Sequence, residues 1–166
     1  MTIKRRGTTS ALKRLAYAQL LILGFSLTHA IQAAPASSLM SGFNPLIGGQ
    51  WVLGSTYQTY TWGPDQQSVF GESFVIHNGE KALGAKGLWY FDPASKTIKG
   101  VFVATNMPFT VLHYRSHFEA GTLISQVRSL DNLGTENHYQ ETIRVTQPDA
   151  YLWELTEAEP AGNTMK

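Results

Sequence analysis

The feature that most constrains the fold is a succession of short segments rich in Val, Thr, Tyr, Phe and Trp, separated at close intervals by turn residues. This texture is typical of β-strands joined by tight turns. The clearest turn is Asn78-Gly79, because both residues tolerate the positive φ that a two-residue hairpin needs. The expected strands are 51–53, 56–62, 68–76, 81–91, 97–105, 109–119, 122–129, 136–146 and 150–156.

Consecutive strands with no crossover helix between them must pair as antiparallel neighbours. A flat sheet of this size would leave two open edges and one bare apolar face, so closure into a barrel is the economical solution. A sandwich is less suited, since Greek-key folds need longer connections. We therefore predict an all-β fold with a single antiparallel up-and-down β-barrel of about 9–10 strands, calycin-like or lipocalin-like.

A membrane-spanning barrel is a further alternative. Such a barrel needs an apolar band on its outer face. The expected strand 136–146 carries Glu141 on one face and both Glu136 and Arg144 on the other. Because neither face is free of charge, the pattern favours a barrel in water.

The first 34 residues have the order of a secretory signal peptide. Residues 1–14 are basic, 15–27 form a mostly apolar run, and 28–34 are rich in small residues. The apolar run is shorter than the roughly 20 residues of a permanent membrane helix. We expect a signal peptide at 1–33, cleaved after Ala33, a periplasmic or secreted protein, and no stable membrane span after cleavage.

The charges divide unevenly along the chain. Five of the 13 Lys and Arg precede residue 15, which leaves eight against all 12 acids, a net charge of −4 beyond the leader. A chain with that balance is a poor partner for a phosphate backbone, so we expect no nucleic acid. The sequence contains no cysteine, which excludes disulfides, thiolate catalysis and cysteine-based zinc sites.

The remaining chain divides into a short helical lead-in segment at 34–50, a β-barrel domain at 51–157 and a flexible tail at 158–166. The lead-in has few strand formers, and Asn44-Pro45 and Gly48-Gly49 interrupt any helical turn in it. We expect its apolar residues Phe43, Leu46 and Ile47 to pack over part of the barrel.

Several short motifs resemble a known family. The segment 44–51, Asn-Pro-Leu-Ile-Gly-Gly-Gln-Trp, looks like the opening of bacterial lipocalin-like proteins of the DUF1579 type. The segments 60–63, 71–74 and 87–93 are similar to the blocks that follow in that family. The resemblance implies a nitrobindin-like or fatty-acid-binding-protein-like barrel with an internal cavity. Haem-binding members of the wider nitrobindin group place a histidine on a strand near the C-terminus, whereas segment 150–156 has none, so we expect no haem or other cofactor.

The most polar expected strand contains His113, Arg115 and His117, which share one face because side chains alternate along a strand. Inside a barrel this face would suit the acidic head group of a ligand. Positions four apart lie about 13 Å from each other, too far to share a metal ion, so we expect no metal site here. The alternative is that these three side chains face water while Leu112, Tyr114 and Phe118 face the core.

Four further residues are candidates for ligand binding. Glu72 is expected to lie near Lys86 across the hairpin, either as a surface ion pair or as a carboxylate in a cavity. Trp62, Trp89 and Tyr114 belong to a heavy aromatic content that would line an apolar pocket or simply fill the core.

These observations support three hypotheses. The first is an exported barrel that binds a hydrophobic or amphipathic small molecule, including one with an acidic head group. The second is a small-barrel enzyme, such as an isomerase, cyclase or lyase, with a cavity His or Glu as general base. The third is an interaction module with a filled core. Oligomeric state stays open.

Overall fold

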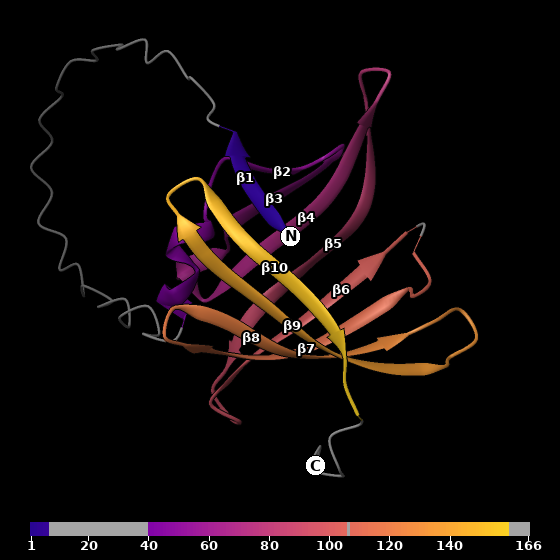
Figure 1. Ribbon diagram of the computed structural model, residues 1–166. Helices are drawn as coiled ribbons and strands as arrows, with labels where there is room; N and C mark the ends of the chain where they lie inside the picture. Colours follow the sequence, from indigo (N-terminus) through magenta and orange to yellow (C-terminus); the bar gives the residue numbers. More distant parts are fainter. Residues whose placement is uncertain (7–39, 106, 160–166) are drawn as a thin grey trace, which may run out of the picture.

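A computed structural model describes residues 1–6, 40–105 and 107–159 of the chain (Figure 1). In these residues ten strands form one closed antiparallel barrel, which confirms the predicted fold. The strands are β1 (Thr2–Arg6), β2 (Gln50–Leu53), β3 (Thr56–Trp62), β4 (Ser68–His77), β5 (Glu80–Asp92), β6 (Thr97–Ala104), β7 (Val111–Glu119), β8 (Thr122–Leu130), β9 (Glu136–Gln147) and β10 (Ala150–Glu157). Two short 3-10 helices, η1 (Met40–Leu46) and η2 (Pro64–Gln66), accompany them.

The nine strands expected from the sequence are all confirmed as β2 to β10, and each pairs with the next along the chain. Turn chemistry explains this success. At the β4–β5 hairpin, Asn78 and Gly79 have φ angles of 51° and 81°, the pair of positive values that the two-residue turn requires.

The strand that was not expected is β1, which lies in the segment interpreted as a leader. It fits between β10 and β2, with Ile3 opposite Tyr151 and Arg5 opposite Trp51, and thereby closes the barrel. Ile3 is buried in the core. The rest of the expected signal peptide, with its cleavage site, lies outside the described residues.

The helix η1 lies at the end of the barrel where β7 finishes (Figure 1). Met40, Phe43 and Leu46 are buried, and the ring of Phe43 lies 5.1 Å from that of Phe118 in an edge-on contact. Trp51 Nε1 also donates a hydrogen bond of 2.9 Å to the carbonyl of Leu46. The lead-in residues thus close one end of the barrel.

Side chains alternate between the core and the outer face along the strands. On β8 the buried positions are Leu123, Ser125, Val127 and Ser129. Ser125 Oγ lies 2.9 Å from Ser116 Oγ of β7, so these two buried hydroxyl groups satisfy each other. This regular alternation decides which side chains of each strand reach the interior.

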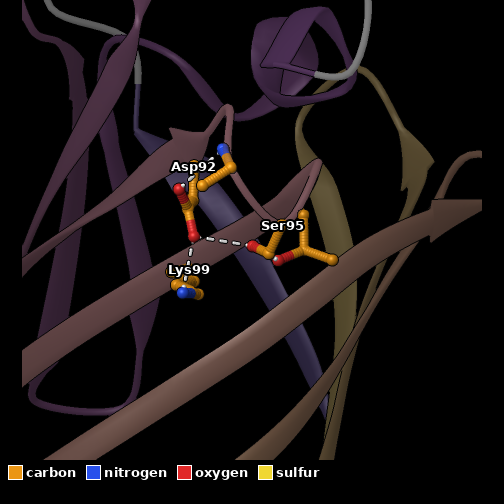
Figure 2. A network of polar contacts seen from close by, with 5 residues as sticks. Asp92, Ser95 and Lys99 are labelled. Atoms are coloured by element: carbon orange, nitrogen blue, oxygen red, sulfur yellow. Dashed lines mark hydrogen bonds and ion pairs between the residues drawn. The ribbon is translucent and has the colours of Figure 1, made fainter. Parts of the chain in front are cut away.

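The β5–β6 turn is held by one carboxylate, that of Asp92 (Figure 2). Its Oδ2 accepts a hydrogen bond of 2.6 Å from Ser95 Oγ and lies 2.5 Å from Lys99 Nζ, and its Oδ1 accepts one from the amide of Ala94. These partners lower the pKa of Asp92 to about 2, with the Lys99 contact as the largest cause.

Across the described ranges 1–6, 40–105 and 107–159, no helix is long and apolar enough to span a bilayer.

Candidate functional site

A cavity of about 150 Å³ lies inside the barrel, lined by residues of β3 to β7, β9 and β10. Phe109 and Met107, from the connection between β6 and β7, border it as well, so it lies toward the end of the barrel away from η1. Most of its lining is apolar. The aromatic contributors are Tyr60, Trp89, Phe102, Phe109, Tyr114 and Trp153, and the aliphatic ones include Ala85, Leu112, Ile143 and Leu155.

Three of these rings form a compact cluster at the wall of the cavity. The ring centroid of Trp89 lies 4.5 Å from that of Phe102 and 5.6 Å from that of Tyr114, and Phe102 and Tyr114 are 5.3 Å apart. The rings are tilted or edge-on to one another, the arrangements that aromatic quadrupoles favour. Space for them exists because Gly71, Gly87 and Gly100 face the cluster, where a methyl group would meet Phe102 or Trp89 within 3 Å.

The most unusual lining residue is Glu141 of β9. It is 7% exposed, and its Oε1 accepts a hydrogen bond of 2.9 Å from Trp153 Nε1 on the neighbouring strand. Its Oε2 is buried and has no hydrogen-bond partner within the described chain. Burial raises the pKa of Glu141 to about 7, and the Trp153 hydrogen bond offsets part of that rise. A carboxyl group in this state exchanges its proton near neutral pH.

Tyrosine hydroxyl groups supply further polar atoms around the cavity. Tyr60 donates a hydrogen bond of 2.8 Å to Gln58 Oε1, which also accepts one from Tyr151. Burial raises the pKa of Tyr60 and of Tyr114 well above their ordinary value, and the charge of Glu141 adds to both shifts. These groups therefore stay neutral and can donate hydrogen bonds throughout the physiological pH range.

One indole also has an unsatisfied donor. Trp89 Nε1 is buried and has no hydrogen-bond partner among the residues that the structure describes. Two residues of the mostly apolar lining, Glu141 and Trp89, thus each carry a buried polar atom without a partner among the described residues, an acceptor and a donor respectively. Unpaired buried polar atoms are costly in a folded protein, and a bound ligand is one way to satisfy them.

Three of the candidates from the sequence border this cavity. Trp89 and Tyr114 lie in its wall, and Glu72 is also among the lining residues. Glu72 forms the expected ion pair with Lys86, at 3.1 Å, and a second with Lys81 at 2.7 Å. These lysines lower the pKa of Glu72, which therefore remains an ion-paired carboxylate. Trp62 is half-buried and packs against the core without lining the cavity.

The other three candidates lie elsewhere. His113, Arg115 and His117 share one face of β7, as the alternation predicts, while Leu112 and Ser116 of the same strand are buried. Arg115 and His117 are exposed and border a hollow of about 700 Å³ over β7, β8 and β9, together with Arg128 and His138. His113 is half-buried, and desolvation lowers its pKa, followed by the effect of Arg128. None of the three lines the inner cavity.

Sequence reasoning did not select Glu141, although a signal for it was present. Glu141 alternates in phase with Tyr139, Ile143 and Val145, the apolar residues that mark the core side of β9. A single acid on the core side of a strand is the pattern to look for, because buried charges are rare unless paired or functional.

Metal ligands are the remaining kind of site to consider. In the described ranges, no three His, Cys, Asp or Glu side chains lie close enough together to hold a metal ion.

Comparison of the chain with protein-family models, with curated proteins and with solved structures finds no match. The interpretation of the site therefore depends on its own geometry.

Proposed function

We propose that this protein is a β-barrel that binds a hydrophobic or amphipathic small molecule in its inner cavity. The observation that carries the proposal is an aromatic-walled cavity whose lining includes Glu141, a buried carboxylate with one unpaired oxygen. Small-molecule sites typically combine a largely apolar wall with a few well-placed polar groups. The binding requires neither a metal nor haem.

The size of the cavity bounds the ligand. Its volume of about 150 Å³ is that of an engineered apolar cavity that binds benzene. A single ring or a short branched chain would fill it, and a longer ligand would extend past Met107 and Phe109. Filling it would bury apolar surface at a gain of roughly 25 cal/mol per Å².

The residues proposed to contact the ligand differ partly from those favoured by the sequence. Trp89 and Tyr114 stay in the set as wall residues, and Glu72 stays as an ion-paired residue of the lining. We assign the polar contact with the ligand to Glu141, which lines the cavity. The sequence favoured His113, Arg115 and His117 for this contact, but none of them lines the cavity. The cavity also favours this proposal over an interaction module, which would have a filled core.

A second candidate function is proton-transfer catalysis on the same site. A carboxyl group whose pKa is about 7 is suited to act as a general base at neutral pH. The hydroxyl group of Tyr114 would stabilise developing negative charge by a hydrogen bond. Binding and catalysis differ in the fate of the small molecule, which a binder returns unchanged.

Export is part of the proposal. A chain cleaved after Ala33 would lack β1 and leave the edges of β2 and β10 unpaired. The intact mass of the protein, purified from a host that secretes it, decides between the two forms. A mass equal to that of residues 34–166 supports export with loss of β1. A mass equal to that of residues 1–166 contradicts cleavage.

A cavity-filling variant tests the binding proposal. Ala85 lines the cavity, and Ala82 of the same strand is exposed. Toluene, measured by isothermal titration calorimetry, is expected to bind the wild type and Ala82→Leu alike. Ala85→Leu should weaken toluene at least tenfold, since the added side chain occupies its space. No binding to the wild type, or equal binding to both variants, would overturn the proposal.

A further inference from the structure

The charges around the cavity are of one sign. Glu141 and Glu72 are both lining residues, and no Lys, Arg or His of the described chain lines the cavity. The charge of Glu72 is matched by Lys81 and Lys86. Glu141 therefore stands alone as the acid whose charge no neighbouring cation offsets.

The hydrogen bonds of Glu141 fix its orientation and leave one oxygen free. Trp153 Nε1 holds Oε1 at 2.9 Å, and Oε2 is buried without a partner among the described residues. A carboxylate oxygen accepts hydrogen bonds only, so a group that satisfies Oε2 must be a donor. An acidic head group would instead place a second negative charge beside Glu141.

We propose, on the basis of the function proposed above, that the ligand is a compact hydrophobic amine whose nitrogen donates a hydrogen bond to Glu141 Oε2. A protonated amine meets the requirements of the site, since it brings a donor and the missing positive charge together. A hydrogen bond between two charged groups is about twice as strong as one between neutral groups. The ligand's apolar part fills the remaining space.

The aromatic wall supports the same class of ligand. Trp89, Phe102 and Tyr114 lie within 6 Å of one another by ring centroid, and all three border the cavity. The faces of aromatic rings attract cations, and the attraction grows when water is excluded. A ring-sized amine in this cavity would place its ammonium group beside Glu141 and near these rings.

The binding is expected to depend on pH through Glu141. The ionisable groups that face it are Tyr60 of β3, Tyr114 of β7 and Tyr151 of β10, and burial raises the pKa of all three. Glu72 is the other acid at the cavity, and its pKa is lowered. Glu141 is thus the group of this set that titrates near neutral pH, and amine affinity should rise as pH rises through about 7.

The test uses four probes of one shape: benzylamine, benzyl alcohol, benzoate and toluene. Their affinities are measured by isothermal titration calorimetry at pH 8 for the wild type, Glu141→Gln and Glu154→Gln. Glu154→Gln is the matched control because Glu154 is an exposed acid of the neighbouring strand β10 that does not line the cavity. Benzylamine should bind the wild type tightest and benzoate weakest. Glu141→Gln should weaken benzylamine roughly tenfold or more, and Glu154→Gln less than threefold.

Three outcomes separate this inference from the proposed function. If toluene and benzyl alcohol bind but benzylamine has no advantage, the cavity is a binding site and the amine proposal is overturned. Equal losses in both variants would also overturn it. If no probe binds, the proposed function fails and the amine proposal with it.

A second measurement covers the case in which Glu141→Gln does not fold. In the wild type alone, benzylamine affinity should increase roughly tenfold between pH 5 and pH 8, as Glu141 ionises. Toluene affinity should stay constant over the same range. A flat profile for benzylamine would overturn the proposal without any variant.

Discussion

Trp153 Nε1 donates a hydrogen bond of 2.9 Å to Glu141 Oε1 across the β9–β10 pair. The two residues come from adjacent strands, and both lie in the wall of the inner cavity. This bond stabilises the carboxylate form of a group whose burial favours the neutral form. The bond therefore limits how far burial raises the pKa of Glu141.

Replacing Trp153 with Phe removes that donor while keeping an aromatic ring in the cavity wall. The pKa of Glu141 is then expected to rise further above about 7, because desolvation acts without its main offset. Carbon-13 NMR titration of the Glu141 carboxyl group measures the change. Trp62→Phe is the control, since Trp62 does not line the cavity, and it should leave this pKa in place. A Trp153→Phe protein with an unchanged or lower Glu141 pKa would contradict the assignment.

Glu141 should also make the free energy of unfolding depend on pH. Its pKa is raised from 4.5 to about 7, so the folded state holds the proton more tightly than the unfolded state. Stability from this group is complete below pH 4.5 and is lost as pH rises toward 7, on the order of 3 kcal/mol in total. Glu141→Gln removes this loss.

Urea unfolding of the wild type and of Glu141→Gln between pH 5 and pH 8 measures the difference. Other groups with shifted pKa values, such as Glu72 and Asp92, are present in both proteins and cancel in the comparison. The stability of the wild type should fall relative to the variant across this range. Parallel profiles would show that Glu141 is not buried as described.

The sequence predicted the barrel because the turns were explicit. Residues such as Asn78-Gly79 and Asp92-Pro93 separate every pair of strands from β4 onward, and tight turns leave antiparallel pairing as the one arrangement. The strand β1 was missed for a physical reason as well. Three of its five residues are Lys or Arg, and Ile3 is its single large apolar side chain, so nothing local marks it as a strand.

The site was harder to predict because alternation gives the grouping of side chains but not their direction. His113, Arg115 and His117 do share a face, yet only the packing of Leu112 inside the barrel decides that this face is the outer one. For Glu141 the direction of the side chain could be predicted, but its burial as an acid was not expected. Its alternation with Tyr139 and Ile143 placed it on the core side of β9. An acid in a strand is ordinarily solvated, so the sequence alone did not identify it as a site residue.

The turn between β5 and β6 offers a prediction that is independent of the cavity. Lys99 is the largest cause of the low pKa of Asp92 (Figure 2), so Lys99→Met should raise that pKa from about 2 toward its ordinary value of 3.8. It should remain below 3.8, because the hydrogen bonds from Ser95 and Ala94 persist. NMR titration of the Asp92 carboxyl group measures both effects.

Lys96→Met provides the control for this turn. Lys96 is exposed in the same connection and is not among the groups that shift Asp92. The pKa of Asp92 should therefore stay near 2 in that variant. An equal rise in both variants would mean that the overall positive charge of the turn, rather than the direct contact with Lys99, lowers the pKa.

Two glycines of β5, Gly87 and Gly84, differ in the space available for a side chain, so replacing each with alanine tests how much close packing contributes to stability. A methyl group on Gly87 would lie 2.1 Å from the carbonyl oxygen of Val101 and 2.6 Å from the Cα of Phe102, both backbone atoms of β6. On Gly84 the nearest atom would be the carbonyl oxygen of Ser73 at 3.4 Å, an ordinary contact. Gly87→Ala should lower the free energy of unfolding by about 2 kcal/mol or more, since overpacking forces strands apart. Gly84→Ala should change it by less than about 1 kcal/mol.

Urea unfolding of both variants beside the wild type checks this pair. The loss in Gly87→Ala should be accompanied by weaker toluene binding, because Phe102 borders both Gly87 and the cavity. Gly84→Ala should bind toluene as the wild type does. If Gly87→Ala is as stable as Gly84→Ala, then β5 and β6 separate at little cost, and close packing at Gly87 does not position the aromatic wall.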